Sequence, residues 1–510
     1  MTYQRQYHQR HHQSLHGLKP DCLSFGEVLG QSIAVIAPIT TPAANLGLIF
    51  ASSGNGTWLS FLIGAIGLLF VSININQFAS RSASPGSLYS YIAKGLGPMA
   101  GVMCGWSLVL AYLFTGMAVL CGFANFGSAL LSHLGIHPSV ITILAIGAGL
   151  AWYAAYKDIE LSAKTLLLLE GLSIGLILIL GIIIWANQGF AIDTAQFTLQ
   201  GATPGGVAMG LVLVVFGFSG FESATSLGDE AKDPLKTIPK SVIGSTILSG
   251  LFFIVMAYIE VLGFSGSSAS LAENEAPLAF LAQKAGVGFL GELISICALF
   301  SFFACVLGSI NPAARVFFMM ARHGLFHSSL GEAHSANQTP HIAVTMSALV
   351  MFLVPASMSL FHINLFESMA YLGTICTYGF LMVYILISIA APVYLHKIGK
   401  LHPLDVVFSV LGVGFMMIPV LGSVGIPGSP IFPVPEPPYD AFPYLFLLYL
   451  VTGCGWFIMQ RLRSPEIVVS MERGIDEIHA RFATPNPVVV PSAVAEQLPR
   501  SMPVQRQSEN

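Results

Sequence analysis

Runs of apolar residues long enough to cross a membrane recur along most of this sequence. A helix needs about 20 such residues to cross the hydrocarbon layer. Windows of this kind centre near residues 38, 69, 115, 148, 174, 215, 251, 303, 350, 378, 414 and 452. Hydrophobic residues make up 54% of the chain and charged residues only 9%, which lies outside the range of soluble domains. The sequence therefore predicts an all-α integral membrane protein whose core, residues 25–465, contains twelve transmembrane helices.

Lysine and arginine residues are distributed unevenly between the connecting segments. If the twelve spans alternate in direction, only Lys284 of the 21 basic residues lies apart from the side that carries both chain ends. Basic residues in short loops stay on the cytoplasmic side of a membrane. We therefore expect a multi-pass protein of the cell membrane with both termini in the cytoplasm.

The two ends of the chain are polar. Residues 1–24 are expected to form a disordered cytoplasmic tail, and residues 466–510 a Pro-rich cytoplasmic tail that is disordered after Met471. Histidines on a tail of this kind offer no preformed metal geometry. The four histidines concerned are His8, His11, His12 and His16. We expect no metal site, no cofactor and no disulfide bond.

Two of the predicted spans carry helix-breaking residues in their middle. The first reads GQSIAVIAPITTPAANLGLIF, and the sixth reads GLVLVVFGFSGFESATSLG. Proline removes a backbone donor, and glycine lets the backbone leave helical angles. Irregular backbone at membrane depth survives only where protein or a polar cavity surrounds it. A matched pair of breaks, five spans apart, is typical of transporters built from inverted repeats, with the solute site at the breaks; a pair of simple kinks is the alternative.

Three stretches resemble the permeases of the amino acid–polyamine–organocation (APC) superfamily. They are ASRSASPGSLYSYIAKGLGPMAGVMCGW, FGFSGFESATSLGDEAKDPLKTIPKSV and INPAARVFFMMARHGLF, and the second is the most specific. The resemblance implies a five-plus-five inverted repeat with broken helices 1 and 6, followed by two additional helices. It also implies secondary active transport by alternating access.

The resemblance further implies a substrate site at the two breaks. Backbone N–H groups of the first break would receive the carboxylate of the substrate, and carbonyls of the second break would hold its ammonium group, with two phenylalanine rings as walls. The first break reads APITTPAA, where many family members carry a small Gly-Ser-Gly motif. The residues expected at this site are Ala37, Pro38, Ile39, Thr40, Thr41, Phe216, Gly217, Phe218, Ser219, Gly220 and Phe221.

Two carboxylates stand out inside predicted spans. Glu222 follows the sixth-span glycines and is interpreted as a structural anchor, as an indirect attractor of the substrate ammonium, or as a titrating group. Glu170 lies about nine residues inside the fifth span, a position similar to one where some proton-coupled family members carry a lysine. It either carries the coupling proton or stays protonated and hydrogen-bonded to a neighbouring helix.

Three further residues are candidates near the site. Tyr112 in the third span and Tyr371 in the tenth are possible pocket walls, with ordinary packing as the alternative. Asn311, together with Pro312, either breaks the eighth span near the site or merely kinks it.

The leading function is transport of an amino acid, driven by protons, by sodium or by exchange, with a proton as the favoured coupling ion. A permease for a polyamine or another organic amine is the neighbouring alternative, and a membrane-embedded enzyme or solute sensor is the rival of a different class. All fourteen histidines lie in tails, loops or span ends, and neither the N-terminal segment nor the Pro-rich tail supplies the sizeable signalling domain that a sensor would need. We therefore expect a permease that is not an enzyme, with a small solute and the lipid bilayer as its partners and no nucleic acid.

Overall fold

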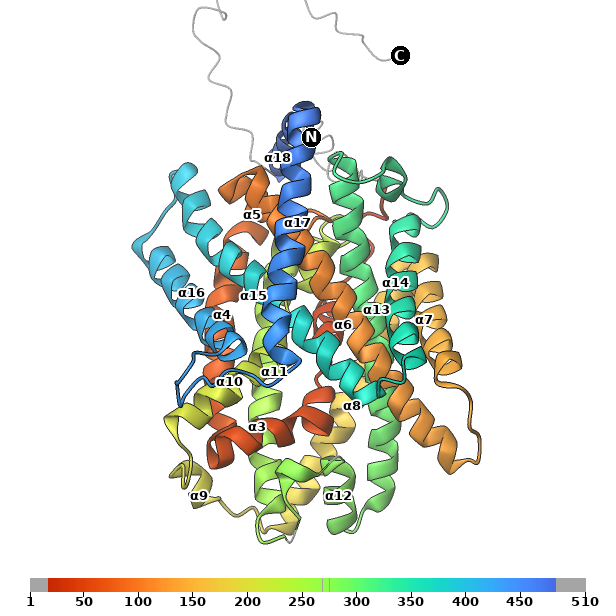
Figure 1. Ribbon diagram of the computed structural model, residues 1–510, viewed down its shortest axis with the longest axis vertical. Coiled ribbons are helices and arrows are strands. Elements are labelled where there is room, and N and C mark those ends of the chain that lie inside the picture. The colour runs from red at the N-terminus through yellow and green to blue at the C-terminus, as the bar shows by residue number, and fades with distance from the viewer. Residues whose placement is uncertain (1–16, 268, 275, 483–510) are drawn as a thin grey trace, which may run out of the picture.

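The computed structural model describes residues 17–267, 269–274 and 276–482 (Figure 1). This part of the chain is a bundle of helices. The helices of the N-terminal half are α2 (Phe25–Ile36), α3 (Leu46–Ser53), α4 (Thr57–Ala79), α5 (Leu88–Leu96), α6 (Pro98–His133), α7 (Val140–Lys157), α8 (Ile159–Asn187), α9 (Thr194–Phe197), α10 (Pro204–Phe218) and α11 (Pro234–Phe264). The remaining helices are α12 (Pro277–Lys284), α13 (Gly288–Arg322), α14 (His341–Leu360), α15 (Leu365–Lys397), α16 (Pro403–Val424), α17 (Phe442–Arg463) and α18 (Glu466–Phe482).

Eleven segments within the described residues are long and apolar enough to cross a membrane, where the sequence predicted twelve. The first of them, Phe25–Ala79, is 55 residues long and contains α2, α3 and α4. At 1.5 Å per residue a continuous helix of this length would span about 80 Å, more than twice the hydrocarbon thickness. Eleven segments are found and not twelve because the first two predicted spans form a single segment here.

Both predicted helix interruptions are present in the backbone. The first follows α2, where Ala37 adopts a left-handed conformation (φ 48°) before a π-helical turn, η1 (Thr41–Asn45). The second follows α10, where Gly220 has φ 101° and a 3₁₀ turn, η3 (Ser223–Leu227), comes next. By contrast, α13 runs without interruption through Pro312, so the eighth span is not broken there.

Glycines allow the central helices α6 and α15 to approach closely. A Cβ atom at Gly379 of α15 would lie 2.7 Å from the carbonyl oxygen of Ser107 and 3.0 Å from the Cβ of Ala111, both on α6. Small residues at such contacts are how membrane helices gain packing energy without a hydrophobic driving force. This close contact brings Tyr112 of α6 and Tyr384 of α15 to the same level of the core, where both are fully buried.

The two ends of the described chain lie on the same face of the bundle, at the top of Figure 1. The amides of Cys22 and Leu23 donate to the carbonyl of Glu230 over 2.8 and 2.9 Å. Arg481, in the last turn of α18, pairs with Asp229 at 2.9 Å. The connection between α10 and α11 therefore contacts both ends of the described chain.

Disorder was the wrong expectation for residues 17–24 and for the chain between Met471 and Phe482. Leu18 and Leu23 are fully buried, and α18 buries Met471, Ile475 and Ile478 on one face. Apolar residues at i, i+4 and i+7 form such a face even when the rest of the helix is charged. The rest of the two expected tails, with the four N-terminal histidines, lies outside the described residues.

Candidate substrate site at the two helix breaks

The two helix interruptions lie against each other. A Cβ atom at Gly217, one residue before the end of α10, would lie 2.9 Å from the Oγ1 of Thr41 in the first break. A Cβ atom at Gly220 would lie 2.2 Å from the Cγ1 of Val35, in the last turn of α2. Both glycines are therefore needed for close approach, and Gly220 also for its positive φ. The side chain of Thr41 and the backbone of Gly217 meet at the centre of this contact.

Side-chain hydroxyls replace the helical hydrogen bonds that the second break lacks. The carbonyl of Phe221 accepts from the hydroxyl of Ser32 at 2.7 Å and from that of Ser245 at 3.2 Å. The amide of Ala224 donates to the Oγ of Ser32 at 3.1 Å. Because an unpaired backbone group inside a membrane costs several kcal/mol, these contacts are what makes the break tolerable.

Glu222 is held by two tyrosines from different helices. The hydroxyl of Tyr112 on α6 donates to Oε1 at 2.7 Å, and that of Tyr384 on α15 donates to Oε2 at 2.6 Å. The hydroxyl of Tyr384 also accepts from the amide of Gly220 at 3.2 Å. Of the three interpretations of Glu222, this geometry favours the structural anchor. Tyr112 is among the residues predicted from the sequence, whereas Tyr384 is not, because its only signal was a phenol inside an apolar run.

The hydroxyl groups of the two threonines in the first break differ in their hydrogen bonding. The hydroxyl of Thr40 donates to the carbonyl of Ala37 at 2.8 Å and so serves the turn itself. The hydroxyl of Thr41 is buried and has no hydrogen-bond partner among the described residues. A buried hydroxyl without a partner is uncommon in folded proteins. Thr41 therefore offers a polar group at the point where the two breaks meet.

The aromatic residues of the second break are packed inside the bundle. Phe218 lies edge-on to Phe253 of α11, with ring centroids 4.9 Å apart, and Phe221 lies 5.1 Å from the ring of Tyr384. Both phenylalanines are fully buried. In this conformation their rings hold the broken segment between α11 and α15.

Two other residues singled out from the sequence lie in different surroundings. The ring of Tyr371 packs against Tyr439 and Phe442, near the start of α17. Asn311 donates to the Oε1 of Gln31 and to the Oγ of Ser162, both at 2.9 Å. It therefore ties α13 to α2, just before the first break, and to α8.

Glu170 is buried on α8 and faces α13. The hydroxyl of Ser301 donates to its Oε1 at 2.7 Å, and its Oε2 has no hydrogen-bond partner in the described part of the chain. One turn further along α13, the thiol of Cys305 donates to the carbonyl of Val35 at 3.3 Å. The same stretch of α13 thus contacts both the buried acid and the helix end that leads into the first break.

Glu260 on α11 is a buried acid that the sequence analysis did not single out. It is fully buried, and neither carboxylate oxygen has a hydrogen-bond partner among the residues described. The available signal was a single acidic residue in the apolar run FFIVMAYIEVLGF. A carboxylate in such surroundings is expensive to ionise.

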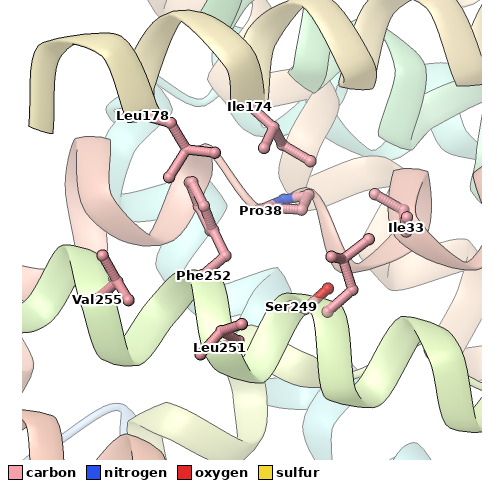
Figure 2. A pocket seen from close by; sticks show the side chains of 9 residues that line it. Ile33, Pro38, Ile174, Leu178, Ser249, Leu251, Phe252 and Val255 are labelled. Carbon is pink, nitrogen blue, oxygen red and sulfur yellow. The ribbon is translucent and has the colours of Figure 1, made fainter. Parts of the chain in front are cut away.

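A cavity of about 200 Å³ lies beside Pro38, between α8 and α11 (Figure 2). Its lining residues are Ile33, Pro38, Ile174, Leu178, Leu248, Ser249, Leu251, Phe252 and Val255. Leu248 and Leu251 are 48% and 60% exposed, so the cavity opens towards the outer surface of the bundle. With Ser249 as its one polar side chain, it does not suit a zwitterion.

Comparison with known proteins identifies the family. The profile of the amino acid permease family matches residues 27–466. This chain belongs to the amino acid permease family. Members of this family and the curated relatives of the chain are transporters, so the chain is a multi-pass membrane permease and not an enzyme.

Curated relatives of this permease differ in the solute that they carry. The branched-chain amino acid permease BcaP of Bacillus subtilis is 27% identical over 458 residues, covering 86% of this chain and 87% of the relative. The low-affinity putrescine importer PlaP of Escherichia coli K12 is 25% identical over 343 residues, 65% of this chain and 74% of the relative. The serine/threonine exchanger SteT of B. subtilis is 25% identical over 348 residues, 64% of this chain and 76% of the relative.

Removal of the Tyr384 hydroxyl tests the anchoring of Glu222 in this permease. Tyr384→Phe leaves one carboxylate oxygen and the amide of Gly220 without their partner, which should destabilise the fold by roughly 1.5–3 kcal/mol. We expect a thermal midpoint several degrees lower for the purified protein. Tyr371→Phe is the matched control, because the ring contacts of Tyr371 are kept. Equal midpoints for the two variants would contradict the anchoring role.

Proposed function

We propose that this permease carries an amino acid by secondary active transport, with the substrate zwitterion held between the two helix breaks. The observation that carries the proposal is the buried, unpartnered hydroxyl of Thr41 opposite Gly217. Interrupted helices present free N–H groups and carbonyls, which suit a carboxylate and an ammonium group respectively. Alternating access then requires that the site at the two breaks is open to only one side of the membrane at a time.

A branched-chain amino acid is the first substrate to test. Glu222 in the second break accepts hydrogen bonds from Tyr112 and Tyr384, and Glu170 on α8 accepts one from Ser301. A diamine would need acidic groups for two ammonium ions, whereas a zwitterion with an apolar side chain needs only the polar groups of the breaks. The alignment with BcaP covers more of this chain than the alignment with PlaP, which supports the same choice. Putrescine is the competitor suggested by PlaP.

For the membrane topology we propose twelve crossings, arranged as the five-plus-five inverted repeat with two additional helices. The 55-residue first segment is long enough for two crossings, which makes the total even. An even number agrees with the contacts that both ends of the described chain make with residues 229 and 230. The basic residues of the connecting segments favour the cytoplasm of the cell for that face.

Substitution of Thr41 tests the substrate site. Thr41→Val keeps the shape of the side chain but removes its hydroxyl. If that hydroxyl binds a charged group of the substrate, leucine binding to the purified permease should weaken by about tenfold or more. Scintillation proximity with radiolabelled leucine measures the affinity, and unlabelled isoleucine, valine, serine and putrescine rank the competitors.

Thr40→Val is the matched control for this experiment. It makes the same chemical change one residue away, but the hydroxyl that it removes already serves the carbonyl of Ala37. We expect nearly unchanged leucine affinity for this variant. If Thr41→Val binds leucine as the wild type does, the proposed site is wrong; if putrescine displaces leucine best, the substrate class is wrong.

For the coupling of transport we propose that Glu170 carries the driving proton. One of its carboxylate oxygens has no hydrogen-bond partner in the described part of the chain, so a proton there breaks no existing hydrogen bond. The contacts of Ser301 and Cys305 on α13 give a route by which its protonation can affect the first break. A proton drives a conformational change only through a difference in affinity between the two states.

Glu170→Gln tests this coupling because it fixes a neutral group of nearly the same shape. We expect leucine binding to persist while accumulation driven by an imposed pH gradient in proteoliposomes falls to the level set by exchange alone. Glu160→Gln, at the start of the same helix and in an ion pair with Lys19, is the control and should still accumulate leucine. If the Glu170→Gln variant still accumulates leucine in response to the pH gradient, the role of Glu170 is structural.

A further inference from the structure

Helix α18 lies across one end of the bundle and is attached to two separate parts of it. Asp476 pairs with Lys94 of α5 at 2.5 Å, and a Cβ atom at Gly101 of α6 would lie 3.0 Å from the Cε of Met471. At its last turn, Arg481 pairs with Asp229 in the connection between α10 and α11. The helix therefore joins the α5–α6 corner to the segment that continues from the second break.

The segment that follows the second break is buried and is held by contacts with several neighbours. Residues 223–231, which follow Glu222 directly, are all buried. Glu230 forms a buried ion pair with Arg315 of α13, and its carbonyl accepts from the amides of Cys22 and Leu23. If the solute site lies at the breaks, opening towards this face requires this segment to move away from its neighbours.

Helix α18 lies outside the part of the chain that defines the family. The match to the permease profile ends at residue 466, and α18 begins at Glu466. Because the family match ends where α18 begins, the contacts of α18 with the bundle call for a separate explanation. A helix fixed to two parts that must separate opposes their separation.

We propose that α18 is a latch that holds residues 223–231 in the closed position, so that its release is required for opening on this face. The contacts of Arg481 with Asp229 and of Asp476 with Lys94 close the latch, and the buried face of Met471, Ile475 and Ile478 seats it. The proposal goes beyond the transport of an amino acid, because it assigns control of one gate to a helix outside the transport core.

A native cysteine reports on this gate. Cys22 is half-buried beside the carbonyl of Glu230, and burial together with the negative charge of Glu230 raises the pKa of its thiol to about 12. Because the thiolate is the reactive form, alkylation of Cys22 should be slow while the gate is closed. Opening exposes the thiol to water and should increase the rate.

The test compares variants that weaken the latch through different contacts in the full-length permease. Arg481→Gln removes the pair with Asp229, and Ile475→Ala weakens the seating of α18 without touching that pair. For both, we expect alkylation of Cys22 by N-ethylmaleimide to become about fivefold faster, the lower range of typical coupling between sites. Mass spectrometry of the labelled protein measures the rate. Arg473→Gln, at an exposed position of the same helix, should leave the rate unchanged.

Two internal readouts complete the experiment. Cys454, half-buried on α17, should react at the same rate in every variant, which excludes general unfolding. Leucine uptake into proteoliposomes should increase in Arg481→Gln and Ile475→Ala; this arm alone rests on the proposed substrate. Unchanged labelling of Cys22 in both variants, or faster labelling of Cys22 and Cys454 together, would overturn the latch whatever the substrate is.

Discussion

The whole arrangement depends on how the backbone groups of the second break are satisfied inside the membrane. The carbonyl of Phe221 accepts two serine hydroxyls, and the amide of Gly220 donates to Tyr384. Without such partners each group would cost several kcal/mol in hydrocarbon surroundings. The partners come from α2, α11 and α15, so the break fixes the positions of three other helices. Glu222 extends the same network to α6 through Tyr112. A helix break inside the membrane is thus stable only because neighbouring helices satisfy part of its backbone.

The membrane class and the helix interruptions were predictable from the sequence because their causes are local. Apolar length indicates a span, and proline or glycine within it disrupts the same few residues. The partner of Glu222 was not predictable in this way, since Tyr384 lies 162 residues away along the chain. Tyr371, in the same span, was the tyrosine predicted from the sequence. Thirteen residues separate the two tyrosines on α15, which is about 20 Å along a helix, so only one of them can lie at the level of the breaks. Selecting it requires the packing of α15 against α6.

The packing of the charged helix α18 and the burial of Glu260 were the least predictable features from the sequence. The apolar face of α18 was not predicted because the tail was interpreted as Pro-rich and disordered, and the surface on which this face docks is formed by elements far away in sequence. Glu260 was missed because a single acidic residue near the end of an apolar run resembles one that reaches water. Its burial becomes visible only when the helices around α11 are in place. In both cases the deciding quantity is solvent exposure, which depends on tertiary packing.

The buried pair between Glu230 and Arg315 has the properties that a reversible gate needs. Removing two ions from water costs several kcal/mol for each ion. Their mutual attraction roughly offsets this cost. When the segment opens, both ions regain water, so the loss of the pair is offset by hydration. An apolar contact of the same size would gain nothing on exposure and would resist opening. The ion pair therefore gives the closed state a defined geometry while adding little to the free energy needed to open it. A modest additional contact, such as Arg481 with Asp229, is then enough to shift the balance between the two states.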